Sequence, residues 1–238
     1  MSPRKLPALL LLPVLLASCA TGSSQAALQQ RRSVQVDHII VGVSDLEAGI
    51  AEFERLSGVR AVPGGAHPGR GTRNALLSLG EGTYLELYAP NPAEAVDTPA
   101  VAELRSLMGL TPIGWAVSTT DVSALRASFG SIGMRLSAPE PGSRLRPDGS
   151  VLQWVTFGFE QFDHPLAPFF IQWRRQDLHP SRTSPTGCRL VSMRLRDPAP
   201  AMLRRAVRPL RLAVAVDQAP ERQMEVRLSC PRGSVTLR

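Results

Sequence analysis

Val36-Asp37-His38-Ile39-Ile40-Val41-Gly42-Val43 is the stretch of the chain from which the fold is predicted. Its Val and Ile residues favour a buried strand, because β-branched side chains pack well on a pleated sheet. Ser44 and Glu47 follow at the spacing of a capping box, so a helix is expected to begin at Ser44 and to end near Gly58. Three short strands are expected next. The segment therefore predicts a βαβββ unit.

The same order of elements returns twice. A second unit follows the first after a linking helix, and it is expected to contain a strand at 134–138 and a Pro/Gly-rich loop at 139–150. Units of this size bury little alone, so we expect them to pair. The predicted domain covers 34–180, with modules 34–90 and 112–175 and the linking helix 93–109. A third, shorter βαβββ-like module at 187–238 leaves a sheet face and an edge uncovered, and is expected to dock on the main domain or on another chain.

These modules resemble the vicinal oxygen chelate superfamily. Tyr84-Leu85-Glu86-Leu87 closes the first module in the way typical of that superfamily, and two further segments narrow the resemblance to the glyoxalase-like domain group. They are His67-Pro-Gly-Arg-Gly-Thr-Arg-Asn-Ala-Leu-Leu77 and Pro168-Phe-Phe-Ile-Gln-Trp173. The resemblance covers about residues 34–180. It implies an α+β, glyoxalase/dioxygenase-like fold, whose paired modules curl their sheets around a central cleft that holds a metal and a small substrate.

Strand alternation gives a separate indication of the cleft. His38 is expected to share a face with Val36 and Ile40, and Glu86 to share one with Tyr84 and Tyr88. A polar residue within an apolar or aromatic face suits a cavity lining, and imidazole and carboxylate are ordinary ligands for divalent transition metals. A core histidine held by Asp37, and a glutamate paired with an arginine, are the alternatives left open.

The resemblance implies one metal ligand from the first and last strand of each module. Those positions fall on His38 and Glu86, then on Trp115 and Gln172. Indole cannot act as a ligand, and a glutamine oxygen is a weak, neutral one. We therefore expect either one divalent metal on His38, Glu86 and Gln172 or no metal, and we assign His38 and Glu86 to proton transfer. His164 and His179 complete the set only if their loops fold back.

Further residues are expected to bind the substrate. Arg70, Arg73 and Asn74 suit a carboxylate or carbonyl, and aromatic walls suit planar or apolar molecules. The predicted substrate-binding set is His67, Arg70, Arg73, Asn74, Tyr88, Trp115, Trp154 and Phe170. A flexible loop, for the polar residues, and plain core packing, for the aromatic ones, are the alternatives.

The N-terminus predicts where the protein resides. Residues 1–19 read as an export signal, and Leu16-Ala17-Ser18-Cys19 resembles a bacterial lipobox. The resemblance implies lipidation of Cys19, with 20–33 as a flexible tether, and Ala20 is compatible with the outer membrane. We expect a lipid-anchored protein of the bacterial cell envelope, facing the periplasm at the outer membrane. An ordinary secretory signal with a chance cysteine is the alternative. The oxidising envelope permits a disulfide between Cys188 and Cys230, and two separate buried thiols are the other reading.

Composition excludes some classes of function. A share of 43% hydrophobic residues excludes wholesale disorder. The net charge is +7, but the arginines are scattered and no nucleic-acid-binding signature is present, so no nucleic-acid partner is expected. Without Gly-x-Ser-x-Gly, hydrolase chemistry is disfavoured. The leading hypothesis is an envelope-anchored glyoxalase-like protein that binds a small organic molecule, with a weak or altered lyase or isomerase activity. The alternatives are a metal-dependent lyase or dioxygenase, and a non-catalytic interaction module that forms a homodimer.

Overall fold

The computed structural model of the protein describes residues 34–80, 82–146 and 149–238. The first module contains one helix and four strands: β1 (Val34–Gly42), α2 (Leu46–Ser57), β2 (Val62–His67), β3 (Thr72–Ser78) and β4 (Tyr84–Pro90). The predicted signal segment, Cys19 and the tether lie outside the described residues. Within the described part of the chain, no helix has the length and apolarity needed to cross a membrane.

Helix α2 forms because its apolar residues recur at helical spacing and both of its ends are capped. Leu46, Ile50 and Phe53 are buried, and Gly58 ends the helix with φ of 78°, in the left-handed region that favours glycine. The N-cap is Asp45, whose side chain accepts a hydrogen bond from Ala48 N at 2.7 Å. The prediction of Ser44 as the cap was therefore wrong by one residue.

The second module repeats the arrangement. Its elements are α3 (Pro99–Ser106), β5 (Thr111–Thr119), α4 (Val122–Gly130), β6 (Glu140–Leu145), β7 (Val151–Phe157) and β8 (Phe169–Trp173), and the short α5 (Pro180–Thr183) follows. Two predictions here were wrong. The segment 139–150, predicted as a loop, contains β6, and the segment 134–138 contributes only an isolated bridge between Leu136 and Phe159.

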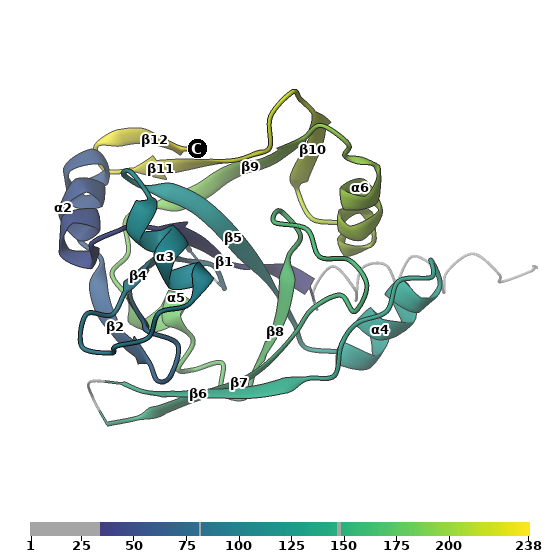
Figure 1. Cartoon of the computed structure of the whole chain (residues 1–238), viewed down its shortest axis with the longest axis horizontal. Helices are drawn as coiled ribbons and strands as arrows, with labels where there is room; N and C mark the ends of the chain where they lie inside the picture. The colour runs from purple at the N-terminus through teal and green to yellow at the C-terminus, as the bar shows by residue number, and fades with distance from the viewer. Residues whose placement is uncertain (1–33, 81, 147–148) are drawn as a thin grey trace, which may run out of the picture.

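The two modules form one curved sheet. Its strand order is β2-β3-β4-β1-β5-β8-β7-β6, with β1 and β5 antiparallel at the centre (Figure 1). In each module the first strand runs parallel to the last, since β1 pairs with β4 and β5 with β8. The two edge strands approach each other, because a Cβ added to Gly65 on β2 would lie 3.3 Å from Cδ of Arg144 on β6. The sheet therefore curls around an interior.

A register shift in β1 decides which side chains enter that interior. Val36 pairs with Val117 and His38 with Ala116, so Asp37 is an extra residue on β1. Such a bulge interrupts the alternation of side chains. Val36 packs against the hydrophobic core on the outer side of the curved sheet, which we call the outer core. Asp37 and His38 instead form hydrogen bonds on the inner side of the sheet. The prediction that Val36 shares a face with His38 was wrong for this reason.

The C-terminal part forms a second sheet with order β10-β9-β11-β12. Its elements are β9 (Arg189–Asp197), α6 (Ala201–Val207), the 3₁₀ turn η1 (Arg208–Leu210), β10 (Val214–Gln218), β11 (Gln223–Cys230) and β12 (Gly233–Leu237). The order of elements is that of the modules, but the pairing differs, because β9 pairs with both β10 and β11. Figure 1 shows this sheet along one side of the curved sheet. Its buried Leu195 and Val226 share one hydrophobic core with Ile39 and Trp115.

The structure forms a disulfide between Cys188 and Cys230, with a distance of 2.09 Å between the sulfur atoms. This is the first of the two readings of the sequence. The bond links the residue before β9 to the last residue of β11, and so joins two neighbouring strands of the second sheet at one end.

Candidate functional site

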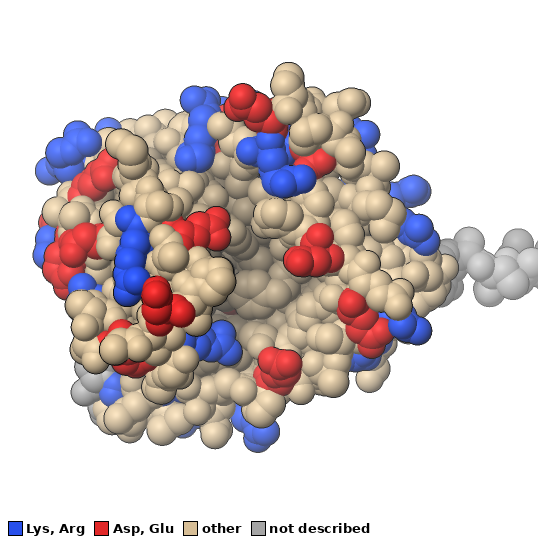
Figure 2. All heavy atoms as spheres, viewed as in Figure 1, with Lys and Arg blue, Asp and Glu red and all other residues tan. Residues whose placement is uncertain are grey.

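A cavity of about 260 Å³ lies inside the curve of the large sheet. Figure 2 shows the face of the molecule hollowed near its centre, inside that curve. Both modules contribute to the lining, and the volume is below the roughly 300–1,000 Å³ usual for drug-sized ligands. The side chains that line the cavity are His38, Ile40, His67, Pro68, Arg70, Asn74, Tyr84, Glu86, Tyr88, Arg144, Trp154, Thr156, Phe169, Ile171 and Trp173.

Asp37 lies beneath the cavity, fully buried, and accepts hydrogen bonds from three side chains. His38 Nδ1 is 2.7 Å from Oδ1, while Trp173 Nε1 and His179 Nε2 are 2.9 and 3.1 Å from Oδ2. Burial raises the pKa of Asp37, but the hydrogen bonds from His179 and His38 outweigh it and lower the pKa to about 2. Asp37 is therefore a carboxylate at neutral pH, held by both modules and by the loop of His179.

The hydrogen bonds around Asp37 fix the orientation of two imidazoles. Ser181 N donates to Nδ1 of His179, so the proton of His179 lies on Nε2 and points to Asp37. His38 donates from Nδ1 to Asp37, which leaves its Nε2 facing the cavity, 3.7 Å from Glu86 Oε2. Tyr84 stacks on the His38 ring, with centroids 4.6 Å apart. An imidazole oriented by a carboxylate in this way is the arrangement of a general base.

Glu86 is held from the opposite side by a short network. Asn74 Nδ2 donates to Glu86 Oε1 at 2.5 Å and lies 3.2 Å from His67 Nε2, while Arg144 Nη1 donates to Asn74 Oδ1 at 2.8 Å. The bond from Arg144 fixes which end of the Asn74 amide is the oxygen. Asn74 therefore donates to both Glu86 and His67, and Glu86 keeps its second oxygen towards His38.

His67 is consequently an acceptor at Nε2 and a donor at Nδ1, which is 3.0 Å from Thr72 Oγ1. Thr72 in turn donates to the Tyr88 hydroxyl at 2.8 Å, so the proton of Tyr88 is available to another acceptor. Burial lowers the pKa of His67, although Glu86 opposes this effect, and burial raises the pKa of Tyr88. Both side chains are therefore neutral at pH 7, and Tyr88 can donate a hydrogen bond to a ligand.

The remaining wall is aromatic and comes mainly from the second module. Trp154 and Trp173 lie with ring centroids 5.4 Å apart, and Phe169 meets His38 edge-on at 5.5 Å. Such walls bind planar or apolar groups. The cavity therefore combines a polar end at His38, Glu86, Asn74 and Arg144 with an apolar end.

Four predicted site residues lie elsewhere. Trp115 is fully buried in the outer core and donates to Leu166 O at 2.9 Å, and Phe170 belongs to the same core. Gln172 faces out and donates to Thr120 O at 3.3 Å. Arg73 pairs with Glu47 on the surface. For Trp115, Phe170 and Gln172 the predicted placement was wrong because β5 and β8 run one residue out of the predicted phase, which brings Phe169, Ile171 and Trp173 inward. For Arg73, on β3, it was wrong because the side chain pairs with Glu47 of α2 instead.

The side chains present do not fit the metal set that the resemblance implied. Gln172 points away, and the inward positions of the second module are Ala116 and Ile171, which offer no donor. In the first module, the Asn74 amide lies between His67 and Glu86 and occupies Nε2 of one and Oε1 of the other. Among the described residues, no three His, Cys, Asp or Glu side chains form a group that could hold a metal ion.

Sequence reasoning missed several residues of the site. The sequence indicates Asp37 only as a residue that holds His38 in the core, and Trp173 is absent from the predicted substrate-binding set. His179 does fold back, to Asp37, whereas His164 binds Asp197 at 3.0 Å, away from the cavity. Arg144 was missed because it lies in the segment taken for a loop. Arg144 stands two positions after Gly142, so the two share a face if 140–145 is a strand. That spacing is the signal in the sequence that could have identified Arg144.

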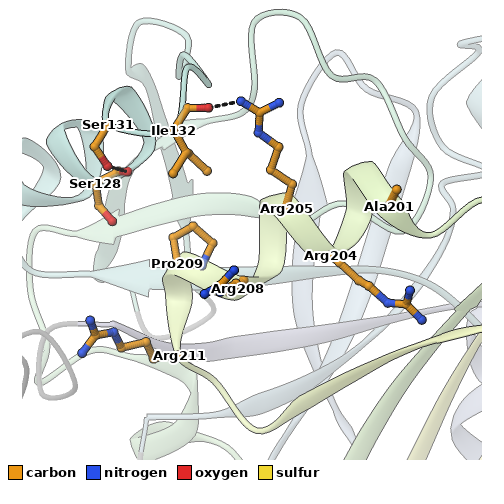
Figure 3. A pocket seen from close by; sticks show the side chains of 9 residues that line it. All are labelled: Ser128, Ser131, Ile132, Ala201, Arg204, Arg205, Arg208, Pro209 and Arg211. Atoms are coloured by element: carbon orange, nitrogen blue, oxygen red, sulfur yellow. Dashed lines mark hydrogen bonds between the residues drawn. The ribbon is translucent and has the colours of Figure 1, made fainter.

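A larger hollow lies elsewhere, between α4 and the α6–η1 segment, with a volume of about 760 Å³. Its lining includes Arg204, Arg205, Arg208 and Arg211 but no aromatic residue, acid or histidine. Figure 3 shows Arg204 and Arg211 extending in opposite directions, and Arg205 donating to the carbonyl of Ile132. Because these arginines do not converge and no acid–base group joins them, the smaller cavity is the candidate site.

Paired βαβββ modules that curl around a cleft define a glyoxalase-like α+β fold. The family model described as a glyoxalase-like domain matches residues 36–210, which is most of the chain. The protein therefore belongs to the glyoxalase-like domain family, within the vicinal oxygen chelate superfamily.

The chain is similar to several solved structures, of which the first has a TM-score above 0.5 and agrees with this fold. A hypothetical protein from Staphylococcus aureus is 14% identical with a TM-score of 0.60, over 86% of this chain and 99% of that chain. Methylmalonyl-CoA epimerase from Mycobacterium tuberculosis is 22% identical with a TM-score of 0.37, over 58% and 85%. A Streptomyces coelicolor methylmalonyl-CoA epimerase variant is also 22% identical with a TM-score of 0.40, over 60% and 99%. No curated protein matches the chain. At these identities the likeness concerns the fold alone.

Proposed function

We propose that the protein binds a small, partly apolar organic molecule in the cavity of the curved sheet, and that His38 and Glu86 transfer a proton on it, as in an isomerase or lyase. The observation that supports this most strongly is the pairing of His38 Nε2 with Glu86 Oε2, 3.7 Å apart at the polar end of an aromatic cavity. Asp37 orients His38 and Asn74 orients Glu86, so both groups are positioned before a ligand arrives.

The chemistry that suits these groups is removal and return of a proton at a carbon next to a carbonyl. His38 and Glu86 reach the same point of the cavity, so either can accept the proton, and the proton returns to carbon from that group or after transfer to the other across the 3.7 Å between them. Tyr88, with its raised pKa, can donate a hydrogen bond to the carbonyl oxygen on which negative charge develops. The aromatic wall holds the rest of the molecule and excludes water.

Proton exchange tests this proposal. Small aromatic and aliphatic carbonyl compounds with an acidic C–H bond are incubated with the protein in D₂O, and loss of the proton signal is followed by NMR. We expect exchange that falls by about 10²- to 10⁴-fold in His38→Gln and in Glu86→Gln, the usual range for loss of one general acid or base. Gln172→Ala, on the outer face, is the matched control. Exchange that both site variants retain would contradict the proposal.

The other two functions make different predictions. A metal-dependent lyase or dioxygenase requires one equivalent of metal that is lost in His38→Ala, and the donor set described above does not favour it. A non-catalytic interaction module requires a free surface, whereas the second sheet, expected to provide one, uses its apolar face to pack on the main sheet. Self-association of the chain, with no ligand bound in the cavity, would favour the non-catalytic interaction module and a homodimer.

We also propose that the protein is anchored to the bacterial outer membrane through lipid on Cys19 and faces the periplasm. The support is the sequence Leu16-Ala17-Ser18-Cys19 after an apolar segment. Metabolic labelling with a fatty-acid analogue should label the wild-type chain in the membrane fraction and should not label Cys19→Ser. Equal labelling of both chains, or none of the wild type, would contradict the anchor.

A further inference from the structure

The buried guanidinium of Arg144 is not used by the proton transfer just proposed. Arg144 is only 8% exposed and lines the cavity from β6, yet Nη1 makes its one hydrogen bond to the described residues, to Asn74 Oδ1. Its Nε is buried and has no hydrogen-bond partner in the part of the chain that the structure describes. A buried cation that lacks acceptors is costly, and the cost is relieved when an anion supplies them.

The protein does not itself provide a carboxylate partner for Arg144 among the described residues. Glu86 is the acid that most favours its charge, but Asn74 lies between the two, and the ion-pair contacts of Glu86 are with His38 and His67. A second cation, Arg70, also lines the cavity. Of the charged side chains in the lining of the cavity, Arg70 and Arg144 are positive and Glu86 is negative.

The protein also preserves space for Arg144. A Cβ on Gly64 would lie 2.4 Å from Oδ1 of Asn74, and one on Gly65 would lie 3.3 Å from Cδ of Arg144. Glycine at both positions lets the guanidinium reach across from β6 to β3, so that the second module completes the polar end built by the first.

We infer that the ligand of the cavity is a small carboxylate with an aromatic or other apolar body, whose carboxylate binds Arg144. The inference rests on the proposed function and adds the class of ligand to it. The carboxylate supplies charge and acceptors to the guanidinium. The apolar body lies along Trp154, Phe169 and Trp173, and the volume of about 260 Å³ limits it to a small molecule.

Matched pairs of compounds test the inference. Benzoate, phenylacetate and hexanoate are compared with benzamide, phenylacetamide and hexanamide, which have nearly the same shape without the charge. Binding is measured by titration calorimetry and by NMR of the indole N–H signals of Trp154 and Trp173. For wild type we expect the carboxylates to bind about 10- to 100-fold more tightly than their amides, the range for a hydrogen bond to a charged group.

Variants assign this preference to Arg144. Arg144→Gln should reduce it to less than about threefold, Arg144→Lys should retain part of it, and Arg73→Gln, on the outer face, should leave it unchanged. If Arg144→Gln does not fold, the lysine variant still decides. Amides that bind wild type as tightly as carboxylates, or a preference that stays undiminished in Arg144→Gln or in Arg144→Lys, would overturn the inference and leave the proposed function standing. Absence of any binding at the two indoles would overturn both.

Discussion

Asp37 and His38 are neighbours in the chain that both face inward, which an uninterrupted strand does not allow. The register shift in β1 makes this possible and places the carboxylate directly behind the imidazole. Asp37 thereby joins β1, β8 and the loop of His179, because it also accepts from Trp173 and His179. At the scale of single residues, this carboxylate is both a positioning group and a source of stability.

The lowered pKa of Asp37 predicts a dependence of stability on pH. A carboxyl whose pKa falls from 3.8 to about 2 on folding stabilises the folded state above pH 4 and loses this contribution as the pH falls towards 2. Asp37→Asn should therefore lower the free energy of unfolding by at least about 2 kcal/mol at pH 7. Urea unfolding between pH 2.5 and 7 measures the difference, which should shrink below pH 4.

Asp217→Asn is the control for that series, since Asp217 is a partly exposed residue paired with Arg194 on the second sheet. Its effect should be small at every pH. A constant difference between wild type and Asp37→Asn down to pH 2.5 would contradict the role given to the three hydrogen bonds.

Residues placed by a pattern within one strand could be identified from the sequence. Residues placed by contacts between distant segments could not. Glu86 was predicted to face the cavity because β4 alternates without interruption. The phase of β8 was predicted one residue off, because a run of five apolar or amide residues gives no clear alternation, and this exchanged Gln172 with Trp173. The contact of Arg144 with Asn74 joins residues 70 positions apart, and no local pattern predicts it.

At the scale of elements, the glycine pair of β2 makes room for Asn74 and Arg144, two residues that line the cavity. The register shift between Pro63 and Gly65 brings β2 close to Asn74 and to β6. The order of elements in the first module followed from the sequence, because its helix is capped and its apolar residues recur regularly. The β6 hairpin did not, since it is rich in Pro and Gly and is stabilised by pairing with β7.

Gly64→Ala tests this packing. The added methyl would meet Asn74 Oδ1 at 2.4 Å, so the amide that holds Glu86 and Arg144 must shift. We expect a loss of about 1–3 kcal/mol of stability, as for overpacked core sites, together with weaker ligand binding. Gly130→Ala, with no atom within 4 Å of the new methyl, is the matched control and should be neutral or slightly stabilising. Equal behaviour of the two variants in thermal unfolding would refute the tight packing.

At the scale of the whole molecule, the second sheet shares its core with the curved sheet and so covers the face opposite the cavity. The disulfide closes a separation of 42 residues within that second sheet. Replacing both Cys188 and Cys230 with serine should lower the free energy of unfolding by about 2–4 kcal/mol, because the unfolded chain gains freedom. Denaturant unfolding of oxidised protein measures this. An unchanged midpoint would mean that the bond does not constrain the unfolded chain.

The three tryptophans of the chain can show whether the cavity inside the curved sheet is the binding site. Trp154 and Trp173 line the cavity, whereas Trp115 lies in the outer core. The measurement is a ¹H–¹⁵N spectrum of the indole groups, assigned with single Trp→Phe variants, during titration with small carboxylates. We expect saturable shifts of the Trp154 and Trp173 signals and no shift of the Trp115 signal. Ligands that shift only Trp115, or that leave all three signals in place, would contradict it.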